Sequence, residues 1–503
     1  MRPLFRMIIP AFPGDNIFTR QAKKTTALGP IIIATVANKL LEWQVEVVDE
    51  NNCPRAPKDE NGLLDHVALQ EEYPAKAAGF YCGLTSTMPR VWELAKFYHQ
   101  QGTFNIAGSW HARYCPEETL KHNIDVVVYR DEGKVIRQIL ENLGEDGFLK
   151  NIPEISFLEN GQFRTNDSEL VEIVGLDSNL SNLPFPDFGL LKYARIKIYP
   201  IGRIRGCSGN CEFCCVNEKP HWACAKYLFE TVKWLVETRR AKKFFLVDDS
   251  LREDLDGTAK FFNMIADRYG SKLHFSIQLW LKIAENIEFL QVIKKAGVRR
   301  ACIGVESPID KDLKAMRKGY NSKKMLEWLK ILQHYVKIHI MLIAGYPLKE
   351  RETFLGAKET IKCFRRFIRK AHPDSVHVML PGPGVGTKLR ERLKKEERLF
   401  SLDVASWRYY DGRFALHKPD DSMSLQELQN LPLKIMSRFY HPLSFVRVVI
   451  KTIIFPLDFF IRGWKNWHRG WTREIVKSGG YLLIRRWKAK QQVDEFIGRL
   501  EDH

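Results

Sequence analysis

Three cysteines lie close together near the middle of the chain, where Cys207, Cys211 and Cys214 fall within one short segment. Gly206 and Gly209 allow the backbone there to curl around a bound group. A tetrahedral zinc site and a [4Fe-4S] cubane each normally take four protein ligands. Three thiolates would therefore leave one iron of a cubane open to a substrate-like molecule.

The other cysteines are expected to be ordinary side chains. A zinc loop that borrows Cys215, Cys224 or His221 is the alternative to a cubane. Cys215 directly follows Cys214 and is poorly placed for the same cubane, so Cys215 and Cys224 are expected to be packed thiols. Small apolar roles are expected for the scattered Cys53, Cys82, Cys115, Cys302 and Cys363.

The cysteine segment follows the first strand of a long α/β region. Six strand-like segments alternate there with helical ones, which predicts a partial (β/α)6 barrel with its active site at the carboxyl ends of the strands. The expected strands are 196–204, 243–247, 273–277, 300–305, 338–343 and 375–380, and the expected helices are 228–238, 257–269, 287–296, 322–335 and 351–370.

The spacing Cys207-x3-Cys211-x2-Cys214, with Phe213 before the last cysteine, closely resembles the signature of radical S-adenosylmethionine (SAM) enzymes. The resemblance implies that each cysteine ligates one iron of a [4Fe-4S] cluster and that SAM chelates the fourth. An electron from a donor such as flavodoxin or ferredoxin would then cleave SAM to a 5′-deoxyadenosyl radical, which removes hydrogen from an unactivated carbon.

Further motifs of the barrel resemble the SAM-binding elements of these enzymes. Asp248 and Asp249 end the strand 243–247, where they would accept hydrogen bonds from the SAM ammonium group or cap the next helix, and both alternatives stay open. The segment 303–307 resembles the Gly-x-Glu-Ser strand of the subgroup that contains methylthiotransferases and cobalamin-linked enzymes.

Within that strand, Gly304 would permit close approach of SAM, while Glu306 and Ser307 would offer polar contacts. Ser276 and Gln278 on the preceding strand would face the ribose. The resemblance extends over about residues 196–395. It includes a Gly-x-Pro turn near the adenine, formed by Gly345 and Pro347, and a Pro-Gly-Thr turn within 381–387.

The first 140 residues also alternate strands and helices, which predicts a parallel, doubly wound sheet of the flavodoxin-like kind. The segments 28–30, 45–49, 108–112 and 125–133 resemble the cobalamin (B12)-binding-type domain that precedes many radical SAM barrels. The expected strands are 5–9, 45–49, 78–84, 104–108 and 125–129, and the expected helices are 30–43, 89–100 and 117–122.

Whether this domain binds cobalamin stays open. The Asp-x-His-x-x-Gly motif that supplies a cobalt ligand is missing, and Ser109 stands where the family has the second glycine of its tail-binding loop. If cobalamin is bound, the resemblance implies contacts from Thr85-Ser86 and Gly108-Ser109. His111 is expected to be a hydrogen-bonding loop residue rather than a metal ligand.

The length of 503 residues suggests about three domains. The expected division is a cobalamin-binding-type domain at 1–145, a linker at 146–194, the barrel at 195–398 and a mainly helical region at 399–503. The N-terminus lacks the apolar core of a signal peptide and no stretch of 18 residues is free of charge. The expected compartment is therefore the reducing cytoplasm.

The C-terminal region is basic and rich in aromatic residues. Residues 431–503 hold 14 Lys or Arg against 6 Asp or Glu, and so carry +8 of the chain's net charge of +18. Four tryptophans and the interrupted apolar segment 445–460 suit a peripheral segment in the headgroup plane at the inner face of a membrane. The alternatives are a helix packed over the barrel mouth and, least expected, a nucleic-acid surface.

The expected function is that of an enzyme that uses a SAM-derived radical, most plausibly for cobalamin-dependent methylation of an unactivated carbon in an apolar or lipid-like small molecule. One alternative is a cobalamin-free radical SAM enzyme that catalyses cyclisation, C–C coupling or oxidation. A second is an RNA-modifying enzyme, and a non-enzymatic reading is a cluster protein whose barrel has lost catalysis. The sequence assigns no residue of the chain to the catalytic step itself.

Overall fold

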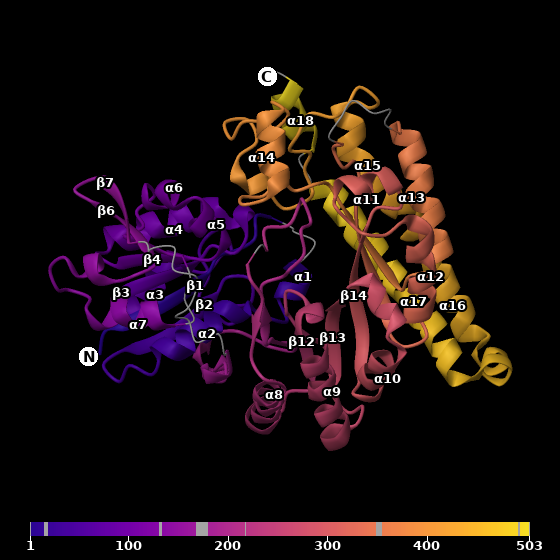
Figure 1. Ribbon diagram of the computed structural model, residues 1–503, viewed down its shortest axis with the longest axis horizontal. Helices are drawn as coiled ribbons and strands as arrows, with labels where there is room; N and C mark the ends of the chain where they lie inside the picture. Colours follow the sequence, from indigo (N-terminus) through magenta and orange to yellow (C-terminus); the bar gives the residue numbers. More distant parts are fainter. Residues whose placement is uncertain are drawn as a thin grey trace. The chain divides into compact units, whose positions relative to one another are not determined.

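The computed structural model describes residues 2–14, 19–129, 133–166, 180–216, 218–348, 355–490 and 493–501 (Figure 1). Residues 130–132 of the expected cobalamin-type motif, 167–179 of the expected linker and 351–354 of an expected helix lie outside this description. The chain divides into two compact units. The first comprises Met1–Ser208, Cys215–His274 and Gly384–Gly386, and the second comprises Gly209–Cys214, Phe275–Pro383 and Thr387–His503.

The first unit is built on an eight-stranded sheet of order β7-β6-β5-β4-β3-β1-β2-β8. Strands β1 to β5 are parallel in the order 2-1-3-4-5, which is the doubly wound, flavodoxin-like arrangement that the sequence predicts. The strand order reverses at β1, because β2 lies on one side of β1 and β3 to β5 follow on the other. The strands are β1 (Leu4–Ile9), β2 (Gln44–Asp49), β3 (Ala75–Tyr81), β4 (Phe104–Gly108) and β5 (Val126–Val128).

Two hairpin strands and a short edge strand extend this sheet from within the expected linker. β6 (Ile155–Glu159) pairs antiparallel with β5 and with β7 (Gln162–Asn166), and β8 (Leu191–Lys192) pairs parallel with β2. The flanking helices are α1 (Thr19–Ala22), α2 (Leu28–Ala37), α3 (His66–Glu72), α4 (Met88–Gln100), α5 (Trp110–Tyr114), α6 (Pro116–Leu120) and α7 (Lys134–Glu141).

Helix α2 ends six residues before the predicted end at Trp43. The chain leaves the helix through tight turns in which the Leu40 backbone N–H donates to the carbonyl of Ala37. Leu40 and Trp43 are nevertheless buried, and the Trp43 indole donates to the carbonyl of Leu140 at 3.1 Å. Apolar residues at helical spacing are thus buried by a turn, which periodicity alone does not distinguish from a helix.

The first unit also contains the start of the barrel. β9 (Tyr199–Ile201) pairs parallel with β12 (Lys243–Leu246), and β10 (Ile204–Arg205) pairs antiparallel with β11 (His221–Trp222). The helices that follow are α8 (Ala225–Arg239) and α9 (Leu255–Tyr269).

The second unit holds four parallel strands that pair in chain order. Together with β9 and β12 they are the six strands that the sequence predicts, in the predicted alternation with helices. They are β13 (His274–Leu279), β14 (Val298–Glu306), β15 (Lys337–Ile343) and β16 (Ser375–Met379), and the helices are α10 (Ile287–Lys295), α11 (Asp310–Ala315), α12 (Ser322–Leu332), α13 (Ala357–Ala371) and α14 (Lys388–Lys395).

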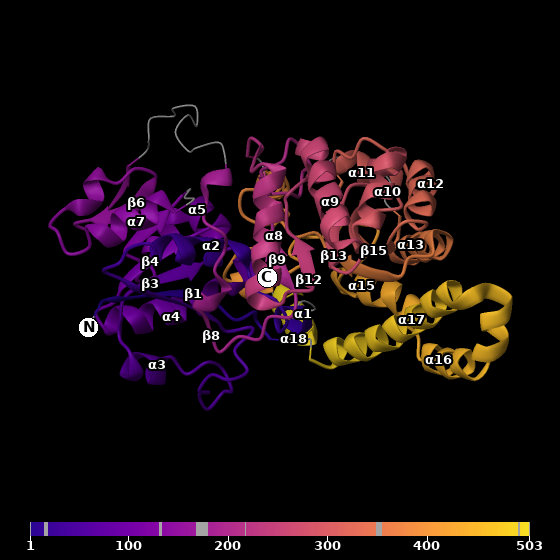
Figure 2. The same ribbon diagram turned by 90° about the horizontal axis from the view of Figure 1, so that it is seen from below.

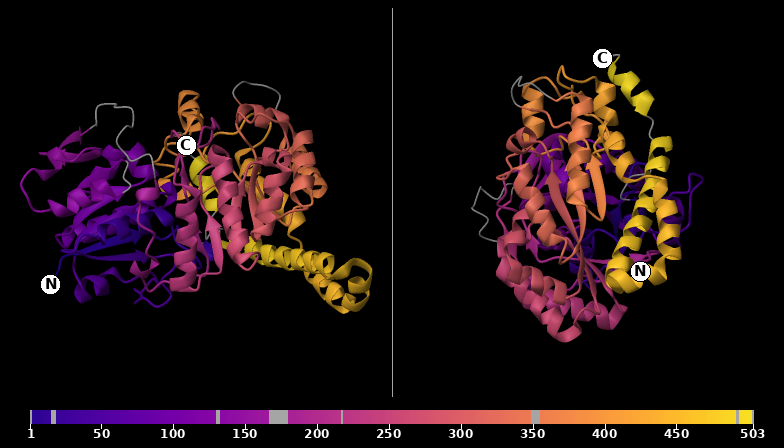
Figure 3. Two further views of the ribbon diagram at one scale, coloured as in Figure 1. Left: turned by 60° about the horizontal axis from the view of Figure 1, so that its bottom comes forward. Right: turned by 90° about the vertical axis from the view of Figure 1, so that its right-hand side faces the viewer.

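The C-terminal part of the second unit is helical, as predicted. α15 (Leu425–Phe439) packs against α13, while α16 (Leu443–Ile453) and α17 (Phe455–Lys490) run side by side as an antiparallel pair (Figures 2 and 3). Gly463 interrupts α17 with a φ of +72°, and α18 (Val493–Glu501) follows. Within the described ranges, no helix combines the length and the apolar character needed to cross a bilayer.

Candidate functional site

The three clustered cysteines lie on the loop that joins β10 to β11. In the described parts of the chain none of the three forms a disulfide bond, and all three side chains are partly exposed. In the second unit, the Cys214 backbone N–H donates to the carbonyl of Cys211 at 3.2 Å, so a tight turn brings these two residues together. The donor set of three thiols on a curled loop fits an iron–sulfur cluster.

Glycine is required at the start of this loop. Gly206 has a φ of +83°, and a Cβ there would lie 2.8 Å from the carbonyl oxygens of Glu218 and Lys219. Its backbone N–H donates to the Asp249 carboxylate at 2.9 Å. The sequence-based expectation that glycine lets the chain curl here is confirmed at Gly206.

Glu212, between two of the cysteines, anchors the loop in the second unit. The side chain is buried, and its carboxylate accepts hydrogen bonds from Arg392 at 2.9 and 3.1 Å and from the Tyr346 hydroxyl at 2.7 Å. The Glu212 carbonyl accepts a further bond from the backbone N–H of Leu389 at 2.9 Å. The sequence pattern does not single out Glu212 or Arg392. The only signal is that Glu212, an acidic residue between proposed metal ligands, needs a cationic partner elsewhere in the chain.

The Gly-x-Pro turn belongs to the same anchor. Gly345 has a φ of +74°, and a Cβ there would lie 2.2 Å from the Leu428 side chain of α15. The carbonyl of Pro347 accepts a hydrogen bond from Arg392 at 2.8 Å. The described contacts of this turn are therefore structural, and its expected contact with the adenine of SAM remains a prediction.

Glu306 ends β14 in a left-handed conformation with a φ of +64°. Its carboxylate is 3.1 Å from the Lys318 ammonium, which also lies over the Phe213 ring at 5.3 Å. Burial is the largest single influence and disfavours the charged ammonium, but the Glu306 charge, the smaller influences of Tyr320 and Cys211 and the hydrogen bond to Glu306 together raise the pKa of Lys318. A Cβ on Gly304 would lie 2.3 Å from the Glu306 carboxylate, so this glycine makes room for the ion pair.

Ser307 is fully buried and holds the turn after β14. Its hydroxyl donates to the Asp312 carboxylate at 2.6 Å and accepts the backbone N–H of Ile309 at 3.1 Å. Burial raises the pKa of Asp312 to about 7. The described partners of Ser307 thus lie in this turn and at the end of β14, and its contact with SAM remains a prediction.

Ser276 and Gln278 lie on the less buried face of β13, because they alternate with the buried Phe275, Ile277 and Leu279. Their register partners on β14 are Arg300 and Cys302. Alternation continues this face to Gly304, so the structure brings Ser276 and Gln278 to the strand face that also carries the glycine of the Gly-x-Glu-Ser motif.

Asp248 and Asp249 hold backbone at the end of β12. One Asp248 oxygen accepts the N–H groups of Arg203 at 2.6 Å and Ile204 at 2.9 Å, while Asp249 accepts that of Gly206. The suggestion that they cap the next helix is wrong, because the α9 cap is Asp254, whose carboxylate accepts the Gly257 N–H at 3.0 Å.

Replacing Asp248 by asparagine is expected to change how stability depends on pH. Burial raises the pKa of Asp248 to about 6. The folded chain then binds a proton at Asp248 more tightly than the unfolded chain does. Protonation of Asp248 therefore contributes to stability below about pH 4, and this contribution is lost as the pH rises through 6. We expect the stability of the wild type, relative to Asp248→Asn, to fall by about 1 kcal/mol between about pH 5 and pH 7.5. Urea unfolding of both proteins at each pH measures this, and parallel pH profiles would contradict it.

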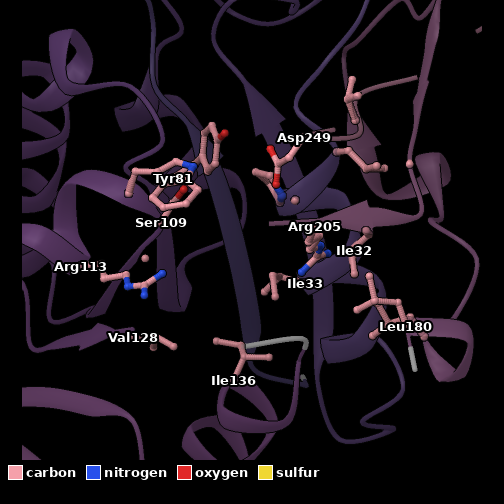
Figure 4. Close-up of a pocket in the computed structure, with 18 of the residues that line it drawn as sticks. Ile32, Ile33, Tyr81, Ser109, Arg113, Val128, Ile136, Leu180, Arg205 and Asp249 are labelled. Atoms are coloured by element: carbon pink, nitrogen blue, oxygen red, sulfur yellow. The ribbon is translucent and has the colours of Figure 1, made fainter. Parts of the chain in front are cut away.

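A cavity of about 500 Å³ lies in the first unit, within the range of ligand-binding pockets (Figure 4). Its walls come from β1, β3, β4, β5 and α2 and from the segments 202–205, 218–221 and 247–249. It adjoins the carboxyl ends of β3 and β4, beside the point where the strand order reverses, which is where doubly wound sheets bind ligands.

The structure separates the four residues expected to contact cobalamin. Gly108 and Ser109 line the cavity, whereas Thr85 and Ser86 do not. Ser86 is buried, and the Thr85 hydroxyl lies 3.4 Å from the imidazole of His111. The short helical turn at 85–87 directs Thr85 and Ser86 toward α5 and the protein interior, and their contact with cobalamin remains a prediction.

His111 itself belongs to a small cluster of potential ligands. Its second ring nitrogen is 3.8 Å from the Glu118 carboxylate, and the ligand atoms of His111, Cys115 and Glu118 all lie within 4.8 Å of one another. The hydrogen-bonding geometry toward Thr85 agrees with the role expected for His111.

Two features of the cavity wall fit a large polar ligand. Ser109 keeps a φ of +85°, a conformation in which glycine is favoured, so the loop retains the backbone path that the family builds with Gly-Gly. The second Asp248 oxygen has no hydrogen-bond partner in the described parts of the chain, although the residue is buried at the cavity wall. Cobalamin carries peripheral amide groups, whose N–H groups could donate hydrogen bonds to such an oxygen.

Ser109 is expected to tolerate glycine but not valine. A branched side chain at this φ adds about 1–3 kcal/mol of strain, while Ser109→Gly relieves strain and loses only a hydrogen bond to Tyr81. We expect Ser109→Gly to unfold within a few degrees of the wild type and Ser109→Val to unfold well below both in a thermal melt. Equal melting temperatures for the two variants would contradict the assigned backbone strain.

Comparison with known proteins identifies the second α/β region. Residues 201–357 match the Radical SAM superfamily. This region of the chain is a radical SAM domain. Its family cofactors are a [4Fe-4S] cluster and SAM, and the cysteine loop lies inside the matched region.

Two curated relatives are named as methyltransferases or methylases. An uncharacterized methyltransferase of Pyrococcus horikoshii is 24% identical over 406 residues, which cover 75% of this chain and 81% of the relative. Hopanoid C-2 methylase of Rhodopseudomonas palustris is 22% identical over 371 residues, which cover 72% of this chain and 63% of that enzyme. The match thus spans less than two thirds of the hopanoid enzyme.

Solved structures with the same fold include two cobalamin-bound radical SAM enzymes. The methyltransferase TsrM from Kitasatospora setae has a TM-score of 0.61 at 12% identity, over 79% of this chain and 75% of TsrM. OxsB with aqua-cobalamin has a TM-score of 0.56 at 15% identity, over 78% of this chain and 56% of OxsB. These similarities confirm the predicted fold class, a doubly wound domain followed by a radical SAM barrel and a helical C-terminal region.

Proposed function

We propose that this chain is a cobalamin-dependent radical SAM methyltransferase that acts on an unactivated carbon of an apolar, lipid-like molecule. The observation that carries the proposal is the cavity of the first unit, at the ligand-binding edge of a flavodoxin-like sheet. Cobalamin is bound by TsrM and OxsB, which share this fold. When bound, it would supply a methyl group that SAM replenishes.

Different parts of the chain would bind the different cofactors. Cys207, Cys211 and Cys214 would hold the cluster, and residues 1–145 would hold cobalamin with Gly108 and Ser109 at the cavity wall. The region 195–398 would bind SAM, the segment 146–194 would connect these domains, and an external electron donor would supply the reducing equivalent.

Toward SAM, the face of β13 and β14 that carries Ser276, Gln278 and Gly304 would orient the nucleoside. Lys318 holds Glu306 in a fixed position, so that the carboxylate keeps its direction at the end of β14. Asp249 holds the cysteine loop through the N–H of Gly206. These contacts position the cofactors, and we assign no proton transfer to any of them.

The lipid-like substrate is supported by the hopanoid relative and by the exposed apolar side chains of α16 and of the start of α17. The experiment is to purify the chain anaerobically after reconstitution with iron, sulfide and hydroxocobalamin, and then to supply SAM labelled in its methyl group together with a lipid extract. We expect about one corrinoid per chain, release of 5′-deoxyadenosine and label in a lipid. A labelled or altered lipid formed without bound corrinoid would instead support a cobalamin-free radical SAM enzyme.

A further inference from the structure

A basic groove of about 760 Å³ lies in the second unit between α13, α15, α16 and α17. Nine of its lining residues are Lys or Arg, and none of the described residues that line it is Asp or Glu. Lys362, Arg366 and Arg369 follow one another on α13 at spacings of four and three, so they share one helix face. Arg438 and Arg447 lie across from them on α15 and α16.

The positive charge of the basic groove is only partly compensated. Arg473 and Lys477 form ion pairs with Asp374 and Glu474, on its α17 side. In the described parts of the chain, no carboxylate pairs with the remaining cations of α13 and α15, which are Lys358, Lys362, Arg365, Arg366, Arg369 and Arg438. Burial and the neighbouring Arg438 charge lower the pKa of Arg365, as expected where cations crowd one another.

An apolar arm adjoins the basic groove. We give this name to the exposed apolar side chains of α16 and of the start of α17. Ile453 is 72% exposed, Leu457 is 69%, Phe460 is 83% and Ile461 is 79%. They lie around the bend between the two helices (Figure 2). Contiguous exposed apolar residues of this size mark an interaction surface.

We propose that the basic groove and the apolar arm together form a docking surface for a membrane that contains anionic phospholipids, with headgroup phosphates in the groove. Cations of a groove are attracted to anionic lipid surfaces, and apolar side chains beside them enter the headgroup and acyl boundary without any spanning helix. A nucleic acid would bind the cations of the basic groove, but it would leave the exposed side chains of the apolar arm without a partner. This inference does not depend on methyl transfer or on cobalamin.

The test is sedimentation of the full-length protein with vesicles of phosphatidylcholine alone or with about one third phosphatidylglycerol. We expect strong binding only to the anionic vesicles, and weaker binding as salt increases. The triple variant Lys362→Glu, Arg366→Glu, Arg369→Glu should bind at least about tenfold more weakly. Ile453→Ser with Phe460→Ser and Ile461→Ser should also weaken binding, and should do so at every salt concentration.

Two matched variants control for net charge and for folding. Lys314→Glu, Lys323→Glu and Lys330→Glu make the same charge change on exposed positions of α11 and α12, and Leu41→Ser removes a 79%-exposed apolar side chain elsewhere. Both controls should bind vesicles like the wild type, and all variants should keep the wild-type melting temperature and iron content. Equal binding of the groove variant and the control variants to anionic vesicles would overturn the proposal. The proposal would also be overturned if the protein bound inorganic phosphate or RNA but did not sediment with anionic vesicles.

Discussion

Replacing Cys211 by alanine is expected to reduce the cleavage of SAM to 5′-deoxyadenosine by more than about 100-fold. Even hydrogen-bond partners of metal ligands cost about 10–100-fold when they are removed, and Cys211 is a proposed ligand itself. Cys211 is a partly exposed free thiol that shares a tight turn with Cys214, so its loss opens a second iron of the cluster. The measurement is deoxyadenosine release under dithionite, together with iron and sulfide content.

Cys215 provides the matched control because it is the adjacent thiol. It is also free and only partly exposed, and burial raises its pKa, which makes it a poor thiolate ligand. Cys215→Ala should therefore retain the iron content and most of the deoxyadenosine release. If Cys215→Ala and Cys211→Ala lose iron equally, the ligand set read from the spacing is wrong, and reconstituted zinc in place of iron would reject the cluster altogether.

Local patterns predict much of this fold. The strands β1 to β5 are short apolar runs bounded by turn residues, and their spacing leaves room for one helix each, which specifies a parallel doubly wound sheet. The six barrel strands follow for the same reason. The cysteine spacing requires only nearby residues, so the loop could be recognised from sequence.

Contacts between distant residues could not be read in this way. Arg392 reaches Glu212 across 180 positions of the chain, and Lys318 reaches Glu306 from a turn after the next helix. A motif gives the position of Thr85 and Ser86 in the chain, but the direction of their side chains depends on the short helical turn that holds them. The sequence does not predict the hairpin β6–β7, because β7 is polar and lies in a segment that resembles a linker.

Replacing Glu212 by glutamine is expected to lower the free energy of unfolding by about 3–5 kcal/mol. The Glu212 side chain is 2% exposed and that of Arg392 is 13% exposed, so the substitution removes the buried carboxylate and leaves a largely buried guanidinium paired only with the more exposed Glu396. Tyr346 keeps only a neutral acceptor. Because Glu212 lies between Cys211 and Phe213, we also expect the cluster to be lost more readily to a chelator.

The second carboxylate partner of Arg392 separates this effect from a general loss of charge. Glu396 is 26% exposed and lies 3.2 Å from the same guanidinium, so Glu396→Gln should cost less than about 1 kcal/mol. Adding Arg392→Met to Glu212→Gln removes the guanidinium that has lost its buried partner and should recover part of the lost stability. Urea unfolding and the rate of iron release measure both effects. If Glu396→Gln destabilises the protein as much as Glu212→Gln, the buried pair does not anchor the cysteine loop, and if stability falls while iron release is unchanged, the pair supports α14 alone.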